Sequence, residues 1–388
     1  MIFTELRFLV FFAIVLGVHW ALPRNRPRKV WLLAASYVFY AAWDWRFLSL
    51  ILGSTIVDYI VGIKLDGDRA PRVRRAWVSV SVIVNLSLLA VFKYFHFFAD
   101  SAAALLQTLG LAIEPSSLRI ILPVGISFYT FQTMSYSLDI YRGKLRATRD
   151  FLDLALFVGF FPQLVAGPIV RARDFLPQLT RRRAASDVAF RPLLLLFLSG
   201  FFKKACISDN ISGVVDTYFT DPSAYDAMSA WIAVLLYAVQ IYCDFSGYSD
   251  MAIATAGFLG YSLCENFAFP YFAGSIQDFW RRWHISLSSW LRDYLYILLG
   301  GGYGGRLFRY RNLMLTMLLG GLWHGAAWRF VIWGGLHGLA LIVHREFHDR
   351  LRGRSFRVPA PVGVLLTFWW VGLTWIFFRA TDWQSAFV

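Results

Sequence analysis

Long apolar runs separated by short polar clusters dominate the sequence. In the first part of the chain these runs are long enough to cross or enter the hydrocarbon core of a bilayer as helices. They predict helices at about residues 5–22, 30–44, 47–64, 76–94 and 119–141. We expect the second and third helices to form a hairpin near Asp44-Trp45-Arg46, and the fourth to continue through the amphipathic stretch 97–112.

The segment 150–172 is also apolar, but Pro162, Gly167 and Pro168 interrupt it and arginines lie at both of its ends. If both ends are cytoplasmic, the segment cannot cross the membrane once, so it should dip in and return or lie along the interface. Non-helical backbone at membrane depth is tolerated only where protein or a water-filled cavity satisfies it. We therefore predict that this segment is re-entrant and lines a cavity.

Apolar runs continue from about residue 190, but polar blocks now interrupt them. We expect helices at about residues 229–243, 312–328, 330–343 and 360–378. The two middle helices should form a hairpin that carries His324 and His337. The polar blocks are 244–250, which follows the first of these helices, 278–288, and a glycine-rich loop at 300–305.

Composition places the chain among polytopic, all-α membrane proteins. Of its 388 residues, 58% are hydrophobic and only 16% are charged, whereas a soluble domain usually carries about 25% charged residues. The formal net charge is +14, but the basic residues lie in short clusters between apolar runs. This pattern is typical of cytoplasmic loops and argues against a nucleic-acid partner. Placing the basic loops 24–29 and 66–75 inside puts the N-terminus outside.

Neither the cysteines nor the N-terminus adds a further kind of site. Cys206, Cys243 and Cys264 are odd in number, no two have metal-ligand spacing, and all lie in or beside apolar segments. We interpret them as buried free thiols and expect no bound metal. The first apolar run has no small-residue cleavage site before the basic stretch 24–29, so we predict a membrane helix rather than a signal peptide.

Two histidines in apolar surroundings are the strongest candidates for chemistry. His324 lies within 319–328, a run of apolar and small residues, and His284 closes the block 278–284. An imidazole is costly to bury in hydrocarbon, so an ionisable residue at membrane depth is a functional candidate. Proton transfer within the membrane is one interpretation of this pair. The other is that each is a core histidine hydrogen-bonded across helices.

Five blocks of the sequence, taken in order, resemble the membrane-bound O-acyltransferase (MBOAT) family and its alginate O-acetyltransferase-like branch. They are 122–132 with its continuation 137–142, 161–171, 242–250, 278–284 and 323–325. The resemblance covers nearly the whole chain. It implies an MBOAT-like helical bundle with re-entrant segments and a central cavity, as a multi-pass protein of the bacterial inner membrane. It also implies one acyltransferase domain over residues 1–388 that lacks one or two C-terminal helices, and Leu298 stands where the family often has proline.

The same resemblance implies an O-acyltransferase. The expected donor is acetyl-coenzyme A or another cytosolic acyl thioester, with no bound cofactor. The expected acceptor is an extracytoplasmic polysaccharide such as alginate, reached directly or through a periplasmic acyltransferase partner. The position of the family's catalytic histidine falls on His324, which we assign as the general base. A neutral imidazole can remove the proton of an attacking hydroxyl, and burial favours the neutral form.

The remaining candidate residues have open roles. His284 could polarise the acyl carbonyl, orient the acceptor or hydrogen-bond within the bundle. The aromatic neighbours of the two histidines, Trp283 and Trp323, and the carboxylates Asp244, Asp250 and Asp278 are assigned to substrate binding. The carboxylates could instead hold a histidine tautomer, pair with arginines or cap helices. Arg281 and Arg282 are interpreted as topology signals rather than phosphate ligands, and His337 as a packing residue.

Two other functions compete with this assignment. A proton-coupled transporter or flippase would predict inverted repeats, and we find none in the sequence. A D-alanyl transferase for teichoic acid shares the histidine blocks, so the sequence separates it poorly from an acetyltransferase. The arginine-rich composition leans weakly away from the low-GC Gram-positive bacteria that commonly make such polymers.

Overall fold

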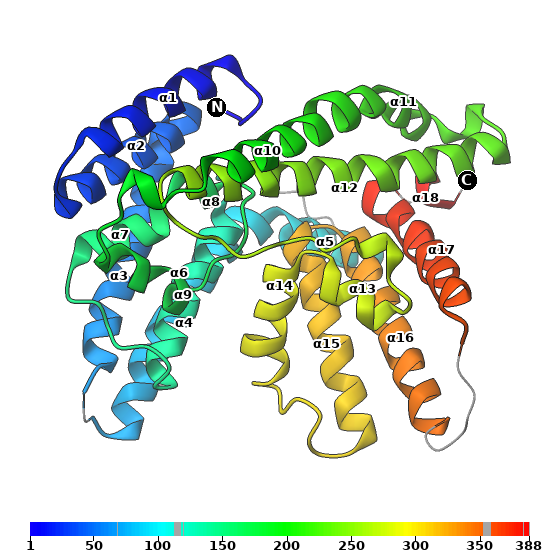
Figure 1. Cartoon of the computed structure of the whole chain (residues 1–388). Coiled ribbons are helices and arrows are strands. Elements are labelled where there is room, and N and C mark those ends of the chain that lie inside the picture. Colours follow the sequence, from blue (N-terminus) through cyan, green and yellow to red (C-terminus); the bar gives the residue numbers. More distant parts are fainter. Residues whose placement is uncertain (68, 112–117, 119, 352–357, 383, 388) are drawn as a thin grey trace. The chain divides into compact units, whose positions relative to one another are not determined.

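The computed structural model describes residues 1–67, 69–111, 118, 120–351, 358–382 and 384–387. Every regular element among these residues is a helix, which confirms the predicted all-α class (Figure 1). The chain forms two compact units, one of residues 1–195 and 252–263 and the other of 196–251 and 264–388. The prediction of a single domain stays a prediction, and each unit is described by itself.

The first unit begins with helices that follow the predicted apolar runs closely. It contains α1 (Leu6–Ala21), α2 (Asn25–Asp44), η1 (Trp45–Phe47), α3 (Leu48–Leu65), α4 (Pro71–Leu89), η2 (Ala90–Tyr94), α5 (Phe95–Thr108), α6 (Ile126–Tyr141), α7 (Phe151–Gly159), α8 (Phe161–Leu164), α9 (Ala172–Thr180) and η3 (Ala185–Asp187). The break between α2 and α3 lies at the predicted place, where the Asp44 carboxylate accepts a hydrogen bond from the Arg46 amide at 3.0 Å.

Two further predictions in this unit are partly or fully confirmed. The helix α4 continues through the π-helical η2 into α5, as predicted. The run at 119–141, in contrast, becomes helical only at Ile126, and residue 119 lies outside the described residues. The reason is local, because Gly125 takes a left-handed conformation with φ of 75°, which α-helical backbone does not allow.

The segment 150–172 is broken, as its prolines and glycine predict. It consists of α7 and α8, separated at Phe160, followed by non-helical backbone up to α9. Protein surrounds it, since Phe157, Phe160 and Phe161 are fully buried. The Phe161 amide donates to Ser36 Oγ at 3.2 Å, so side chains satisfy part of the broken backbone. That the segment lines a cavity remains a prediction.

A buried polar network holds α3, α4 and α6 together, and the hydropathy pattern does not predict it. The fully buried Asp58 accepts hydrogen bonds from Ser81, from Ser137 at 2.5 Å and from Asn85 at 2.8 Å. Asn85 in turn accepts from Thr133 at 2.9 Å. Such a network is tolerated at membrane depth because its members satisfy one another.

The second unit carries both candidate histidines. Its helices are η4 (Phe202–Ser208), α11 (Asp209–Thr220), η5 (Pro222–Ala224), η6 (Pro270–Phe272), α13 (Ile276–Arg282), α14 (Ile285–Trp290), η7 (Leu291–Tyr296), α15 (Arg306–His324), α16 (Trp328–Arg350), α17 (Ala360–Arg379) and α18 (Gln384–Phe387). The helices α10 (Phe190–Phe201) and α12 (Ala227–Phe258) contribute residues to both units.

Length and composition mark several helical runs as able to cross a membrane. Among the described residues these runs are Asn25–Leu65, Pro71–Thr108, Ala227–Phe258 and Ala360–Arg379. The last of them coincides with the helix predicted at 360–378. Together with the all-α content, these runs support the prediction of a polytopic membrane protein.

The structure corrects the prediction that the polar block 244–250 follows a helix, because α12 runs straight through it. Ion pairs neutralise its carboxylates inside the helix, with Lys203 Nζ 2.5 Å from Asp250 and Lys204 Nζ 2.7 Å from Asp244. Both lysines lie on η4. The charged residues at 244–250 therefore do not mark the end of a helix. Their lysine partners neutralise the carboxylates, which allows these residues to lie within α12.

The prediction that all three cysteines are buried was wrong for two of them. Cys243 is buried, but Cys206 and Cys264 are exposed. In a soluble protein an apolar neighbourhood favours burial, whereas in a membrane protein apolar residues also face lipid. Apolar surroundings in the sequence therefore did not distinguish the interior of this protein from its outer surface.

Candidate active site

The helices α15 and α16 form the predicted hairpin, which places His324 at its turn (Figure 1). Glycines let the two backbones approach closely. A Cβ atom on Gly321 would overlap the Phe330 carbonyl oxygen, and one on Gly334 would overlap the Met317 carbonyl oxygen. Close approach through small residues is how membrane helices commonly pack.

His324 is the last residue of α15, and aromatic rings surround it. Its ring centroid lies 5.1 Å from those of Trp323 and Trp333, and 5.4 Å from that of Phe378. Gly325 then takes an extended conformation, with φ of −162° and ψ of 148°, and turns the chain toward α16. The imidazole is thus carried by a helix end and fixed on its sides by large apolar groups.

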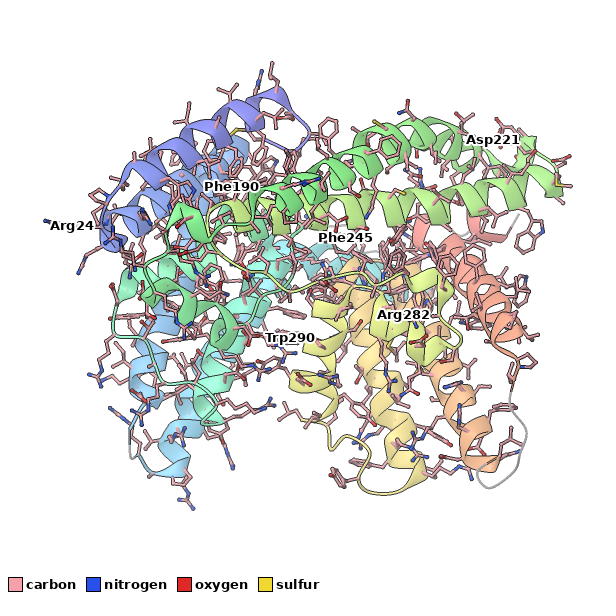
Figure 2. All side chains as sticks on the ribbon, viewed as in Figure 1. Arg24, Phe190, Asp221, Phe245, Arg282 and Trp290 are labelled. Carbon is pink, nitrogen blue, oxygen red and sulfur yellow. The ribbon has the colours of Figure 1, made fainter. Side chains whose placement is uncertain are left out.

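His284 lies between the short helices α13 and α14, whose last residues include the labelled Arg282 and Trp290 (Figure 2). Its side chain is buried, and its backbone takes φ of 43° and ψ of 56°, a conformation rare for residues other than glycine. The imidazole lies edge-on to Phe245 with ring centroids 4.6 Å apart, and 6.2 Å from the ring of His324. The structure therefore brings the two predicted histidines together.

Asn266 fixes the backbone around His284. Its carbonyl oxygen accepts from the Ile285 amide at 2.9 Å, and its side-chain oxygen accepts from Ser286 Oγ at 2.7 Å. Its side-chain amide donates to Ser249 Oγ at 3.2 Å, which ties the loop to α12. A rare backbone conformation persists when its surroundings over-determine it, and such positions cluster at functional sites.

His337 lies on α16 and not on a continuation of α15. Because the chain turns at residues 325–327, α16 runs back along α15, and the His337 ring lies 4.8 Å from that of Trp333. His337 is fully buried, and its Nε2 is 3.0 Å from Thr374 Oγ1. This hydrogen bond between helices agrees with its interpretation as a packing residue.

A cavity of about 500 Å³ begins at His324 and follows α15. On α15 the lining residues are Arg309, Leu313, Thr316, Met317, Gly320 and His324, whose spacing is that of one helix face. Arg309 precedes His324 by fifteen positions, which corresponds to about 22 Å along the helix axis. The cavity is therefore elongated, with the imidazole toward one end.

The two ends of this cavity differ in chemistry. Trp333 lines it beside His324, whereas Arg309 lines it near the start of α15, and His344 and Arg345 line it near the end of α16. Two further arginines of the lining come from other elements, Arg281 from α13 and Arg292 from η7. Asp349 is shared, since Arg309 approaches it at 2.6 Å and Arg345 at 3.5 Å. One end is thus aromatic and the other is suited to an anion.

The three predicted carboxylates are not among the residues that line this cavity. Asp278 forms an ion pair with Arg282 at 3.0 Å on α13, where both side chains are half-buried. Asp244 and Asp250 pair with the lysines of η4. Of the two predicted tryptophans, Trp283 is buried and stacks on Phe279, while Trp323 packs 5.8 Å from the His284 ring. The substrate-binding roles assigned to these five residues stay predictions.

The sequence prediction did not assign to the site several residues that line the cavity. Trp333, Arg309 and Arg345 were given no role in it, and Arg281 was interpreted only as a topology signal. The helical spacing of 309, 313, 316, 317, 320 and 324 is visible in the sequence. It would have marked the face of the helix that ends in His324, had the helix been known to begin as early as Arg306.

Comparison with known proteins assigns the chain to a family. The profile of the membrane-bound O-acyltransferase family matches residues 142–379. A probable alginate O-acetylase of Azotobacter vinelandii is 44% identical over 388 aligned residues, which cover 98% of this chain and 76% of that protein. A peptidoglycan O-acetyltransferase of Helicobacter pylori is 40% identical, with 92% and 72% covered.

A more distant similarity concerns the competing function. A teichoic acid D-alanyltransferase of Bacillus subtilis is 28% identical over 58% of this chain and 59% of its own length. The matched region 142–379 contains both histidines and every residue that lines the cavity. The chain therefore belongs to the membrane-bound O-acyltransferase family.

Proposed function

We propose that this protein transfers an acetyl group from a cytosolic thioester to a hydroxyl of an extracytoplasmic polysaccharide, from a place in the bacterial inner membrane. The observation that carries the proposal is the elongated cavity, with an imidazole near one end and arginines near the other. The acetyl group and the polysaccharide acceptor are supported by the names of the relatives that are 40–44% identical.

His324 acts as the general base in this proposal. As the acceptor hydroxyl attacks the acyl carbon, its proton moves to the imidazole, and the leaving thiolate then takes a proton back. The rings of Trp323, Trp333 and Phe378 pack around the His324 ring and hold it in place. His284, at 6.2 Å from His324, orients the acceptor or polarises the acyl carbonyl.

The donor in this proposal is acetyl-coenzyme A or another thioester whose carrier bears phosphate. Arginine side chains bind phosphate through paired, charge-assisted hydrogen bonds, and Arg281, Arg292, Arg309 and Arg345 line the same cavity as His324. A phosphate group held by them leaves an extended arm to carry the thioester along α15 to the imidazole. The donor is a substrate, so no bound cofactor is required.

The acceptor in this proposal is alginate or a similar polymer, reached directly or through a periplasmic acyltransferase partner. The similarity to peptidoglycan O-acetyltransferase makes peptidoglycan the second acceptor to test. D-alanyl transfer to teichoic acid is less favoured, because the relatives of that name are less similar and align with a smaller part of the chain.

The test is the O-acetyl content of the host's surface polysaccharide in a deletion strain. The strain is complemented with the wild type, with His324→Ala or with His348→Ala, at equal membrane abundance. His348 is exposed on α16 and is not among the cavity-lining residues, so it is the matched control. We expect acetylation with the wild type and the control but not with His324→Ala. Full acetylation with His324→Ala would contradict the assignment of His324 as the general base. If the wild type does not restore acetylation of the polysaccharide, that polysaccharide is not the acceptor.

A further inference from the structure

Asn266 and Ser249 tie the loop that holds His284 to α12, and the proposed function gives neither of them a role. Each of the two residues is only 1% exposed. The Asn266 Nδ2 atom donates to Ser249 Oγ at 3.2 Å. The Ser286 amide, which can only donate, approaches Asn266 Oδ1 at 3.3 Å, and this contact determines which end of the side-chain amide faces Ser249. Because both ends of the Asn266 amide have partners, the connection between the loop and α12 is specific.

The segment that begins at Asn266 holds the backbone on both sides of His284. The Ile285 amide donates to the Asn266 carbonyl oxygen at 2.9 Å. Two residues after Asn266, the Ala268 amide donates to the Arg282 carbonyl oxygen at 3.0 Å. His284 lies between these two hydrogen bonds with φ of 43°. Its backbone conformation, and with it the direction of the imidazole, is therefore set by this segment.

The helix α12 contacts His284 in two ways. Phe245, labelled in Figure 2, lies edge-on to the imidazole with ring centroids 4.6 Å apart. Ser249, four positions later on the same helix face, reaches the loop of His284 through Asn266. The imidazole is thus held from α12 both directly and through its backbone, and its ring lies 6.2 Å from that of His324. A shift of the loop away from α12 would change this distance.

We propose that Asn266 and Ser249 are positioning residues, which hold the His284 imidazole at the place relative to His324 that acyl transfer requires. This inference rests on the proposed function, in which His284 orients the acceptor or polarises the acyl carbonyl. Neither Asn266 nor Ser249 is among the residues that line the cavity, so they act through His284 rather than on a substrate. A displacement of about 1 Å at a reacting group can lower the rate by about 10²-fold. The polar block 244–250 thereby contributes to the site through its Ser249.

A general loss of stability has to be separated from this role, and Ser54 supplies the matched control. Like Ser249, it is 1% exposed, and its Oγ donates to the side chain of a buried asparagine, Asn85, at 2.9 Å. Ser54 lies in the other compact unit. Ser249→Ala and Ser54→Ala therefore remove the same group from the same kind of pair. We expect both substitutions to lower the temperature of unfolding by a similar amount, but only Ser249→Ala to change the rate of transfer.

The rate is measured in inverted membrane vesicles from the complemented deletion strain, supplied with labelled acetyl-coenzyme A at varied concentration. Incorporation of label into polymer gives the maximal rate per folded protein and the KM. We expect Ser249→Ala to lower the maximal rate by about tenfold and Asn266→Ala by about 10²-fold. The KM should change little, because the imidazole takes part in the chemical step and not in donor binding. Ser54→Ala should retain the wild-type rate and KM.

A conservative substitution gives a second measurement of the same role. Asn266→Asp keeps one oxygen for Ser286 and places another where the Ser249 hydroxyl can donate to it. It should therefore recover most of the rate that Asn266→Ala loses. A purely stabilising role predicts no recovery, because an acidic group is costly to bury at this place. An Asn266→Asp protein that is no faster than Asn266→Ala would contradict the positioning role.

Three further outcomes overturn the inference while the proposed function stands. One is a wild-type maximal rate in Ser249→Ala, which is decisive even if Asn266→Ala does not accumulate. Another is an equal loss of rate in Ser54→Ala, and the third is a raised KM for acetyl-coenzyme A at an unchanged maximal rate. If wild-type vesicles incorporate no label, or if His324→Ala vesicles incorporate as much as wild type, the proposed function itself fails and the positioning role falls with it.

Discussion

His284 shows how far a single residue could be predicted. It was predicted as a candidate site residue because, like His324, it is ionisable and lies in apolar surroundings, and the structure places the two rings 6.2 Å apart. Its left-handed backbone was not expected, because nothing in the sequence distinguishes a histidine in that conformation from one in a helix. The ion pairs of Asp244 and Asp250 were not predicted for a similar reason, since their lysine partners lie 40 and 47 positions away in the sequence.

The backbone and the imidazole of His284 can be tested separately. We expect His284→Asn to fold to wild-type abundance, because asparagine tolerates the left-handed region. A β-branched residue does not, so His284→Val should lower the free energy of unfolding by about 1–3 kcal/mol. Thermal unfolding of the purified protein would measure this difference.

The same pair of variants decides what the imidazole does. If His284 belongs to the site, His284→Asn loses polysaccharide O-acetylation although it is folded. If His284→Asn acetylates as well as the wild type, the imidazole is structural and only the backbone conformation matters.

At the scale of elements, the hydropathy pattern predicted most helices and the interruption at 150–172. It failed where structure depends on partners or on small changes of helical geometry. The continuous α12 was predicted as a helix followed by a polar block, and the π-helical segments η2, η4 and η7 were not predicted at all. A π turn differs from an α turn by one residue, and apolar periodicity does not resolve so small a shift.

The α15–α16 hairpin gives an element-scale prediction. Gly334→Ala should separate the two helices, because the added methyl group meets the Met317 carbonyl oxygen rather than a flexible side chain. We expect a loss of about 1–3 kcal/mol in stability and a loss of O-acetylation, since α15 carries His324.

Gly17→Ala is the control for this change. Gly17 is also helical, and a Cβ atom there meets nothing within 4 Å. Thermal unfolding and acetyl content would be compared for both variants. A Gly334→Ala protein that resembles Gly17→Ala in both measurements would contradict the close-packed hairpin.

At the scale of the whole molecule, the amount of positive charge is clear from the sequence, but its location could be predicted only in part. The net charge of +14 was assigned to loops between membrane helices. Several of these charges, among them Arg309 and Arg345, instead line the cavity that contains His324. Folding brings Arg292 to the same cavity from η7, and only a three-dimensional arrangement can reveal that convergence.

This distribution of charge predicts how the donor binds. Arg345→Gln should raise the KM for acetyl-coenzyme A by roughly tenfold, equivalent to about 1.4 kcal/mol, with little change in kcat. Arg350→Gln is the control, because Arg350 lies on the same helix but is not among the cavity-lining residues. Added salt should raise the wild-type KM and reduce the difference between wild type and Arg345→Gln.

The vesicle assay with labelled acetyl-coenzyme A measures these constants. Equal KM values for Arg345→Gln and Arg350→Gln would show that the basic end of the cavity does not bind the donor. A KM that is independent of salt would contradict electrostatic binding in general.

The π-helical segment η7 has a consequence for how this chain can vary in evolution. Its six residues, Leu291–Tyr296, follow directly after α14 and the loop that holds His284. Each π turn contains one residue more than an α turn, and one residue corresponds to about 100° of helix rotation. Loss of a single codon there would rotate the residues that follow it in η7, Tyr296 among them, by about 100° relative to α14, whereas a substitution leaves that angle unchanged. Natural sequences should therefore vary in residue type across these six positions but not in their number.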